Sequence, residues 1–337
     1  MRVHIADYFR LMRIPGIVGL AMTPVVGALT VNSFSLTVLA PLFLIGVISK
    51  IYGFVMNDYV DIEVDKLSND LKDRALVKGT ISKQTALGII ITTWILGYLA
   101  VFVFFYRADP LFYMGLVCIV ISDILGIIYN VYGKKLIGSD FLIALSECMF
   151  FLFGAFMALS IGTPGVLTWI IFIILFNEQL YMNVVAGGLK DADHDYKRGV
   201  KNIALASGVK VKNDNSLHIP RSFKIFGLGE RVCSSILVFF PFLFFGVEYY
   251  WWQIPVLLLF VVLLLYSSGN MLTMKTFNRK NIRKQIAVQL LIWHLFIPII
   301  LLSIIGYVYL LALLLLPLVW YGFVSFFIRQ KFFESQM

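Results

Sequence analysis

The chain has 337 residues, 60% of them hydrophobic and 14% charged, and its mean hydropathy is +0.88. This apolar composition excludes a soluble globular protein of this length and is typical of membrane proteins with several spanning helices. The formal net charge is +9, and its distribution, described below, places it in loops at the membrane surface, so that we expect no nucleic-acid partner.

The first residues and the cysteines exclude two further classes of protein. Residues 1–16 mix basic, acidic and apolar side chains, so we expect no cleaved signal peptide. Cys118, Cys148 and Cys233 lie in apolar segments without CxxC spacing. We therefore expect them to be small buried side chains, without a disulfide framework or a zinc site.

Long apolar runs follow one another from residue 17 onward, and a helix needs about 20 residues to cross a bilayer. The sequence therefore predicts an all-α polytopic membrane protein with nine to ten spanning helices, the last two separated only by Gly306. The ten candidate spans are residues 17–32, 35–57, 84–105, 110–131, 139–161, 164–187, 229–248, 252–274, 285–305 and 307–328.

The basic residues predict the orientation of these spans. With this set of spans, all of the 28 Lys and Arg residues except Arg107 and Lys50 fall in segments on the side of the N-terminus. Loops rich in Lys and Arg stay in the cytoplasm. We therefore expect an integral membrane protein, of the plasma membrane in a prokaryote, with both termini and all long loops cytoplasmic.

One of these cytoplasmic segments is an unusually long polar insert, residues 207–227. Asn213-Asp214-Asn215 marks a turn within it. Its length suits either a cap over the cytoplasmic end of the helices or a flexible surface loop.

An acidic cluster directly follows the apolar run 36–56. If that run continues as a helix, Asn57, Asp61 and Asp65 lie on one face at positions i, i+4 and i+8, with Asp58 beside them. Several oxygen ligands on one face at a membrane boundary suit a hard divalent cation. Mg²⁺ is the usual one where phosphates complete its coordination.

A second acidic cluster, Asp191-Ala192-Asp193-His194-Asp195, follows the apolar run 164–187. Asp191 and Asp195 form the i, i+4 pair, whereas Asp193 points elsewhere on a helix. Nearby basic side chains, including Arg74 and Lys201, could neutralise phosphate oxygens that a metal leaves uncovered. The same arrangement four spans apart suggests an internal duplication that brings the two clusters together.

A few ionisable residues lie within the apolar spans, where they are costly and are usually functional. Lys50 lies two turns before Asn57 on nearly the same helix face, so it is directed toward the first cluster. Lys50 with Asp123, Glu147 and Glu178 could alternatively form the pathway of an ion-coupled transporter. A phosphatidyl-alcohol transferase is a weaker alternative, because its D-G-x-x-A-R signature is absent.

At its two acidic clusters the chain resembles the UbiA superfamily of intramembrane prenyltransferases. The superfamily's first motif, NDxxDxxxD, is met by Asn57, Asp58, Asp61 and Asp65, and its second motif, DxxxD followed by x-K-x-G-x-K, by residues 191–201. Further similar positions are Lys50 ahead of the first motif, Arg74 after it, and Tyr129 and Lys134 after the fourth span.

This resemblance implies an all-α bundle around a central cavity with cytoplasmic cap loops, in which Mg²⁺ binds a polyprenyl diphosphate. It implies that the allylic diphosphate ionises and that an acceptor then captures the carbocation. The catalytic residues implied are Asn57, Asp58, Asp61, Asp65, Asp191 and Asp195, of which all but Asp58 are the metal ligands. The diphosphate-binding residues implied are Lys50, Arg74, Lys134, Lys197, Lys201 and Tyr129.

The resemblance covers about residues 10–305 and leaves the acceptor open between a small aromatic acid of the quinone type and a lipid phosphate of the archaeal glyceryl type. The chain departs from the superfamily's pattern by its long insert, by Ala75 and Val77 in place of two prolines, and by a tenth span. We expect a single membrane domain over residues 1–337, with halves of about 10–161 and 162–305 and an extra helix at about 307–328.

Overall fold

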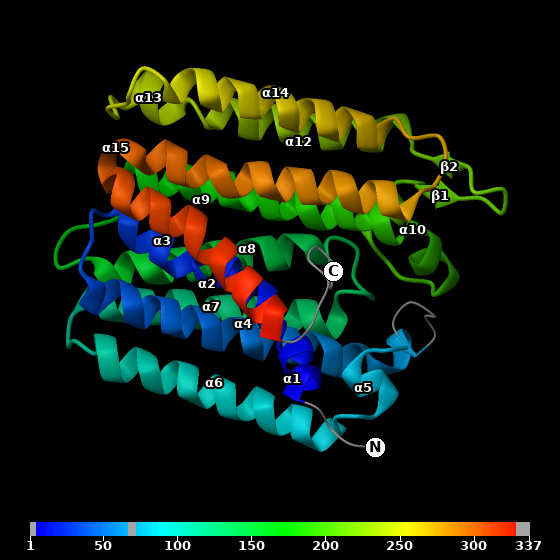
Figure 1. Ribbon diagram of the computed structural model, residues 1–337, viewed down its shortest axis with the longest axis horizontal. Coiled ribbons are helices and arrows are strands. Elements are labelled where there is room, and N and C mark those ends of the chain that lie inside the picture. The colour runs from blue at the N-terminus through cyan, green and yellow to red at the C-terminus, as the bar shows by residue number, and fades with distance from the viewer. Residues whose placement is uncertain (1–4, 67–71, 328–337) are drawn as a thin grey trace. The chain divides into compact units, whose positions relative to one another are not determined.

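The computed structural model describes residues 5–66 and 72–327, except for the side chains of Val64 and Lys197. The described residues are predominantly helical, with two short strands (Figure 1). They belong to two compact units, the first made of Met1–Val120, Phe150–Pro164 and Leu311–Met337 and the second of Ile121–Met149 and Gly165–Leu310. Three helices continue from one unit into the other: α7 (Pro110–Tyr132), α8 (Ser139–Ala158) and α15 (Arg279–Phe327).

The first unit is built around the long helix α4 (Leu36–Asp65), which packs along α6 (Lys83–Phe105) (Figure 1). No glycine or proline interrupts residues 54–65, and α4 remains helical through the first acidic cluster, as predicted. The shorter elements of this unit are α1 (Ile5–Leu11), η1 (Ile14–Gly16), α2 (Ile17–Ala21), α3 (Thr23–Thr30) and α5 (Ala75–Lys78).

Glycines let the helices of the first unit approach one another closely. A Cβ atom added to Gly154 in α8 would lie 1.9 Å from the carbonyl oxygen of Pro24, and one added to Gly27 would lie 2.1 Å from that of Phe151. Small residues of this kind are what allows backbones to pack closely where lipid removes the hydrophobic driving force. At the other end of the chain, Trp320 Nε1 donates a hydrogen bond of 2.8 Å to the carbonyl oxygen of Ile14.

The second unit has α9 (Val166–Leu180), a π-helix (Tyr181–Gly187) and α10 (Gly188–Lys197) as one uninterrupted helical stretch. This stretch bears the second acidic cluster near its end. The remaining elements of the unit are α11 (Ile203–Ala206), β1 (Lys210–Val211), β2 (Leu217–His218), α12 (Arg221–Leu237), α13 (Phe240–Phe244) and α14 (Gln253–Leu272).

The insert is an ordered β-hairpin and not the flexible loop that was one of our two expectations. Lys210 pairs with His218 and Val211 with Leu217 in antiparallel register. The hairpin also bonds to the segment before α15, because the Leu217 N–H donates to the Lys275 carbonyl at 2.8 Å. The predicted end of the insert at residue 227 is wrong, since α12 begins at Arg221.

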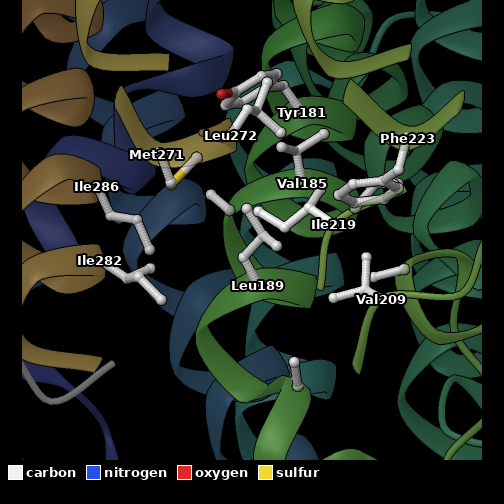
Figure 2. Packing of buried hydrophobic residues seen from close by; sticks show 14 of the residues in the cluster. Tyr181, Val185, Leu189, Val209, Ile219, Phe223, Met271, Leu272, Ile282 and Ile286 are labelled. Carbon is white, nitrogen blue, oxygen red and sulfur yellow. The ribbon is translucent and has the colours of Figure 1, made fainter. Parts of the chain in front are cut away.

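A hydrophobic cluster joins the π-helix and α10 to the hairpin and to α12, α14 and α15 (Figure 2). Val185 and Leu189 lie in its middle, with Met271 and Ile282 on one side and Phe223 on the other. All five side chains are almost fully buried. The back of the acidic helix α10 is therefore packed against elements that follow it in the chain.

Seven helices are long and apolar enough to cross a membrane, or eight if the bent pair Ile5–Leu11 and Ile14–Thr30 is one span. Gly306, with φ 68° and ψ 173°, divides α15 where the last two spans were predicted to separate. The predicted span 229–248 is wrong, because α12 ends at Leu237 and α13 follows it. The all-α membrane class is confirmed, whereas the count of nine to ten spans and the central cavity stay predictions.

Candidate active site

The first acidic cluster occupies the last turns of α4, and its aspartates are nearly buried. The exposed fractions of Asp58, Asp61 and Asp65 are 8%, 9% and 3%, and Asn57 is half-buried. Carboxylates so far removed from water require cationic or hydrogen-bonding partners. This cluster is therefore built for charge binding and is not a solvated helix end.

Arg74, immediately before α5, connects two of these carboxylates. Its Nη1 donates to Asp65 Oδ2 at 2.6 Å and to Asp58 Oδ1 at 3.1 Å. Arg13, whose backbone adopts the left-handed conformation between α1 and η1, donates to the same Asp58 oxygen at 3.1 Å. The structure thus brings predicted residues Asp58, Asp65 and Arg74 together and adds Arg13, which the sequence analysis had only counted as a loop charge.

Lys50 is buried in α4, seven residues before Asn57, and its Nζ lies 5.3 Å from the centre of the Phe150 ring. Arg13 similarly lies over the ring of Phe54, at 4.7 Å. Aromatic faces attract cations, most strongly where water is excluded. Two buried positive charges therefore accompany the acidic turns of α4 within the first unit.

The oxygen donors of the first cluster fit Mg²⁺ as part of a diphosphate site. Among residues 5–66 and 72–327, no three Asp, Glu, His or Cys side chains converge as a complete metal cage. Mg²⁺ is usually bound by one or two carboxylates together with substrate phosphates and water. Asn57 and Asp61 supply donors of this kind, and the Asp65 carboxylate is bound by Arg74.

The second acidic cluster lies on α10 within the second unit. Asp195 Oδ2 accepts a hydrogen bond of 2.8 Å from Asn202 Nδ2, and Asn202 Oδ1 in turn caps α11 by accepting from the Leu205 N–H. Asp191, which is more exposed, lies 3.4 Å from Lys190 Nζ. The i, i+4 pair of carboxylates is thus present on a helix, as predicted.

Three of the predicted diphosphate-binding residues lie close to this second cluster in the chain's local structure. The Lys201 N–H donates to the Lys134 carbonyl at 3.0 Å, which joins the loop after α10 to the loop after α7. Tyr129 is half-buried in the last turns of α7. The backbone of Lys197 ends α10, while its side chain lies outside the described part of the chain.

Asp193 belongs to a structural contact, consistent with its different helix face. Arg279, the first residue of α15, donates from Nη2 to Asp193 Oδ1 at 2.5 Å and from Nε to the Lys190 carbonyl at 3.2 Å. Its Nη1 lies 2.8 Å from His194 Nε2. The start of α15 is thereby fixed to the acidic helix.

The sequence analysis placed Arg231 in a cytoplasmic loop, and this is wrong. Arg231 lies within α12 with 1% of its surface exposed and pairs with Glu178 of α9, which is equally buried. The amphipathic pattern of residues 221–237 was the signal that could have placed it inside a helix. Because Glu178 is neutralised by Arg231, it is not an open carboxylate of a transport pathway.

Fold and residues together define a helical membrane protein with two aspartate clusters, each accompanied by basic side chains. Residues 19–276 match the sequence profile of the UbiA prenyltransferase family, and the chain belongs to that family. Both acidic clusters fall within the matched residues. The protein is therefore a UbiA-type prenyltransferase.

Among curated proteins, the chain is similar to digeranylgeranylglyceryl phosphate synthases. It is 24% identical over 212 residues to that of Sulfurisphaera tokodaii and 26% identical over 212 residues to that of Sulfolobus acidocaldarius. Each alignment covers 62% of this chain and 72% of the relative. These relatives are distant, so their acceptor is not transferred to this chain by identity alone.

Two solved structures share the fold. A structure of digeranylgeranylglyceryl phosphate synthase has a TM-score of 0.65 and 19% identity, covering 89% of this chain and 98% of that one. A UbiA homologue from Archaeoglobus fulgidus bound to GPP and Mg²⁺ has a TM-score of 0.63 and 17% identity, covering 89% and 99%. At these identities the likeness establishes the membrane fold.

Proposed function

We propose that this protein transfers a polyprenyl group from a polyprenyl diphosphate to a glyceryl phosphate lipid. The family match supports the prenyl transfer. The observation that favours a lipid phosphate over an aromatic acid is the name shared by its curated relatives, digeranylgeranylglyceryl phosphate synthase. The sequence alone had left these two acceptor classes open.

In this proposal both acidic clusters act on the diphosphate. Asn57, Asp61 and Asp65 of the first cluster, and Asp191 and Asp195 of the second, hold Mg²⁺. When bound, Mg²⁺ supplies neutralisation of the negative charge that develops on the leaving diphosphate. The presence of GPP and Mg²⁺ in the Archaeoglobus fulgidus homologue supports this assignment.

The basic residues have a separate role, which is to bind diphosphate oxygens directly. Arg74 is positioned by Asp58 and Asp65, so its charge is fixed beside the metal ligands of α4. Lys50, Lys134, Lys197, Lys201 and Tyr129 complete this set of proposed contacts. The allylic C–O bond then breaks with its electrons passing to the diphosphate. The acceptor hydroxyl oxygen bonds to the freed carbon and loses its proton.

The membrane location of the donor and acceptor suits this chemistry, because both are lipids with long apolar chains. We place the acidic clusters and the hairpin on the cytoplasmic side, since nearly all Lys and Arg residues lie in the loops of that side. Whether the hairpin caps the site is part of the same proposal and rests on its position next to α10.

The test is a transfer assay with purified protein in lipid, Mg²⁺ and radiolabelled geranylgeranyl diphosphate. We expect label to enter geranylgeranylglyceryl phosphate and not 4-hydroxybenzoate, and EDTA to abolish the product. Transfer to 4-hydroxybenzoate alone would replace the proposed acceptor and keep the reaction. Absence of transfer to either, with no Mg²⁺-dependent binding of the donor, would contradict the proposed reaction itself.

A further inference from the structure

A π-helical turn separates the membrane helix α9 from the acidic helix α10. Residues Tyr181–Gly187 are π-helical, and the Gly188 N–H donates to the Asn183 carbonyl five residues earlier. Asn183 Nδ2 also donates to the Gln179 carbonyl at 2.7 Å, four residues earlier. Segments of π-helix are rare, occur mostly as single turns within α-helices and are frequent at functional sites. This one immediately precedes the second acidic cluster.

A buried cation fixes the point at which the π-helix begins. Both Nη atoms of Arg231 pair with Glu178 in the last turn of α9, and the guanidinium carbon lies 3.5 Å from the centre of the Tyr181 ring. Arg231, Glu178 and Tyr181 each expose 1% of their surface. Arg231 therefore contacts the helical stretch on both sides of the α-to-π junction.

The same guanidinium extends into a network with α14 and α15. Arg231 Nη2 donates to Gln289 Oε1 at 2.8 Å, Gln289 Nε2 donates to Ser267 Oγ at 3.1 Å, and Ser267 Oγ donates to Gln285 Oε1 at 2.7 Å. A buried ion pair is weak evidence for stability, because apolar side chains of similar size often replace it without loss. Its connection to a π-helix points to a geometric role.

The π-helix determines which way the acidic residues face. Each residue of an α-helix advances the side-chain direction by about 100°, whereas the wider π turn advances it less. Seven π residues therefore turn α10 relative to α9 away from the direction that an unbroken α-helix would give. The contact of Arg279 with Asp193 and the Lys190 carbonyl and the packing of Leu189 in the hydrophobic cluster (Figure 2) suit only this direction.

We propose that Arg231 is a positioning residue for prenyl transfer: by fixing the α-to-π junction it sets the direction of Asp191 and Asp195. The proposal rests on the proposed function for the role of these two aspartates. It does not rest on that function for the helix geometry. Arg231 itself lies on α12 and acts through Glu178 and Tyr181.

The experiment measures geometry and activity separately in the full-length protein in lipid. Spin labels at Tyr196→Cys in α10 and Ile225→Cys in α12, in a Cys233→Ser background, report the distance between the two helices by pulsed electron resonance. Both label sites are exposed, at 61% and 62%. The activity of the unlabelled protein is followed against Mg²⁺ concentration.

We expect Arg231→Met to shift or broaden the label distance and to raise the Mg²⁺ concentration for half-maximal rate by about tenfold or more, as for residues that orient metal ligands. Arg231→Lys should restore part of both. Deletion of Val184, which turns α10 by about 100°, should change the distance further and abolish transfer. If the deletion variant does not fold, Arg231→Met decides the question.

Gln253→Met is the matched control, because Gln253 is also a fully buried polar residue of this unit, bonded to the Ile299 carbonyl at 2.6 Å. It should lower thermal stability and change neither the label distance nor the Mg²⁺ requirement. An Arg231→Met protein that behaves like this control would overturn the proposal. A shifted distance in a protein that transfers no prenyl group would support the geometric role and contradict the proposed function.

Discussion

At the scale of single residues, Arg74 connects Asp58 to Asp65 across two turns of α4. One guanidinium can make both contacts because its donors form a planar fork, which the single ammonium group of lysine does not reproduce. The two aspartates thus keep a fixed positive charge next to Asp61, which we propose as a metal ligand.

Replacement of Arg74 tests this arrangement. We expect Arg74→Ala to lower kcat/KM by about 10²-fold, the loss seen when one preorganised charge-stabilising donor is removed, and Arg74→Lys to recover only part of it. Steady-state kinetics with radiolabelled donor measure the effect. Lys66→Ala is the control, since Lys66 pairs with Glu63 at an exposed position and such pairs contribute little.

The proposed metal ligands make a second prediction. Asp61→Asn and Asp191→Asn keep side-chain size but remove a charge, so each should lower the Mg²⁺-dependent rate by about 10²-fold or more, corresponding to several kcal/mol of charge stabilisation. Asp73→Asn should be neutral, because Asp73 is 95% exposed. A variant at 61 or 191 with an unchanged rate and Mg²⁺ dependence would remove that residue from the metal site.

The spacing of Asn57, Asp58, Asp61 and Asp65 made the acidic site predictable, because those residues depend only on one helix. The buried pair of Glu178 and Arg231 was not predictable, because its two members are 53 residues apart and meet only when α12 packs on α9. A single arginine near the start of an apolar run has the same sequence signal as a loop cation.

At the scale of elements, the close helix contacts of the first unit depend on glycine. Gly154→Leu would place a side chain where a Cβ already lies 1.9 Å from a carbonyl oxygen, so the helices must separate. We expect a loss of about 1–3 kcal/mol in unfolding free energy, as for overpacked cores, visible as a lower Tm in detergent.

The control for this substitution is Gly88→Ala in α6. A Cβ added at Gly88 has no described atom within 4 Å, and alanine favours a helix over glycine by about 0.8–1.0 kcal/mol. Its Tm should remain equal or rise. A Gly154→Leu protein as stable as the Gly88→Ala protein would show that the contact tolerates separation.

The helices themselves were largely predictable, since apolar runs of about 20 residues have few other interpretations. The π-helix and the hairpin were not, because neither has a strong local signal. The hairpin depends on a partner strand segment at Lys275–Phe277, about 60 residues away in the chain and unrelated to it in pattern.

At the scale of the whole molecule, the distribution of basic residues predicts one topology. A cysteine at Asp214, in the turn of the hairpin, should react with a membrane-impermeant maleimide only in inside-out vesicles. A cysteine at Tyr106, which is 61% exposed before α7, should react only in right-side-out vesicles. Labelling of both from the same side would contradict the proposed orientation.

Membership of the UbiA prenyltransferase family was accessible from two short motifs because they cover the chemistry that the family shares. The acceptor was not accessible, since no residue in either motif contacts it in a way that the sequence reveals. The prediction of one membrane domain with two successive halves also stays a prediction. The two compact units alternate along the chain and do not follow that division.

The bond from Trp320 to the Ile14 carbonyl has a consequence for biosynthesis. Residues 311–327 belong to the same unit as Arg13 and α4, yet the ribosome makes them after the whole second unit. The first-made helices must therefore wait in the membrane, with Asp58 and its arginine partners still short of their final neighbours. We expect nascent chains arrested before residue 311 to be much more sensitive to protease in this unit than released full-length chains.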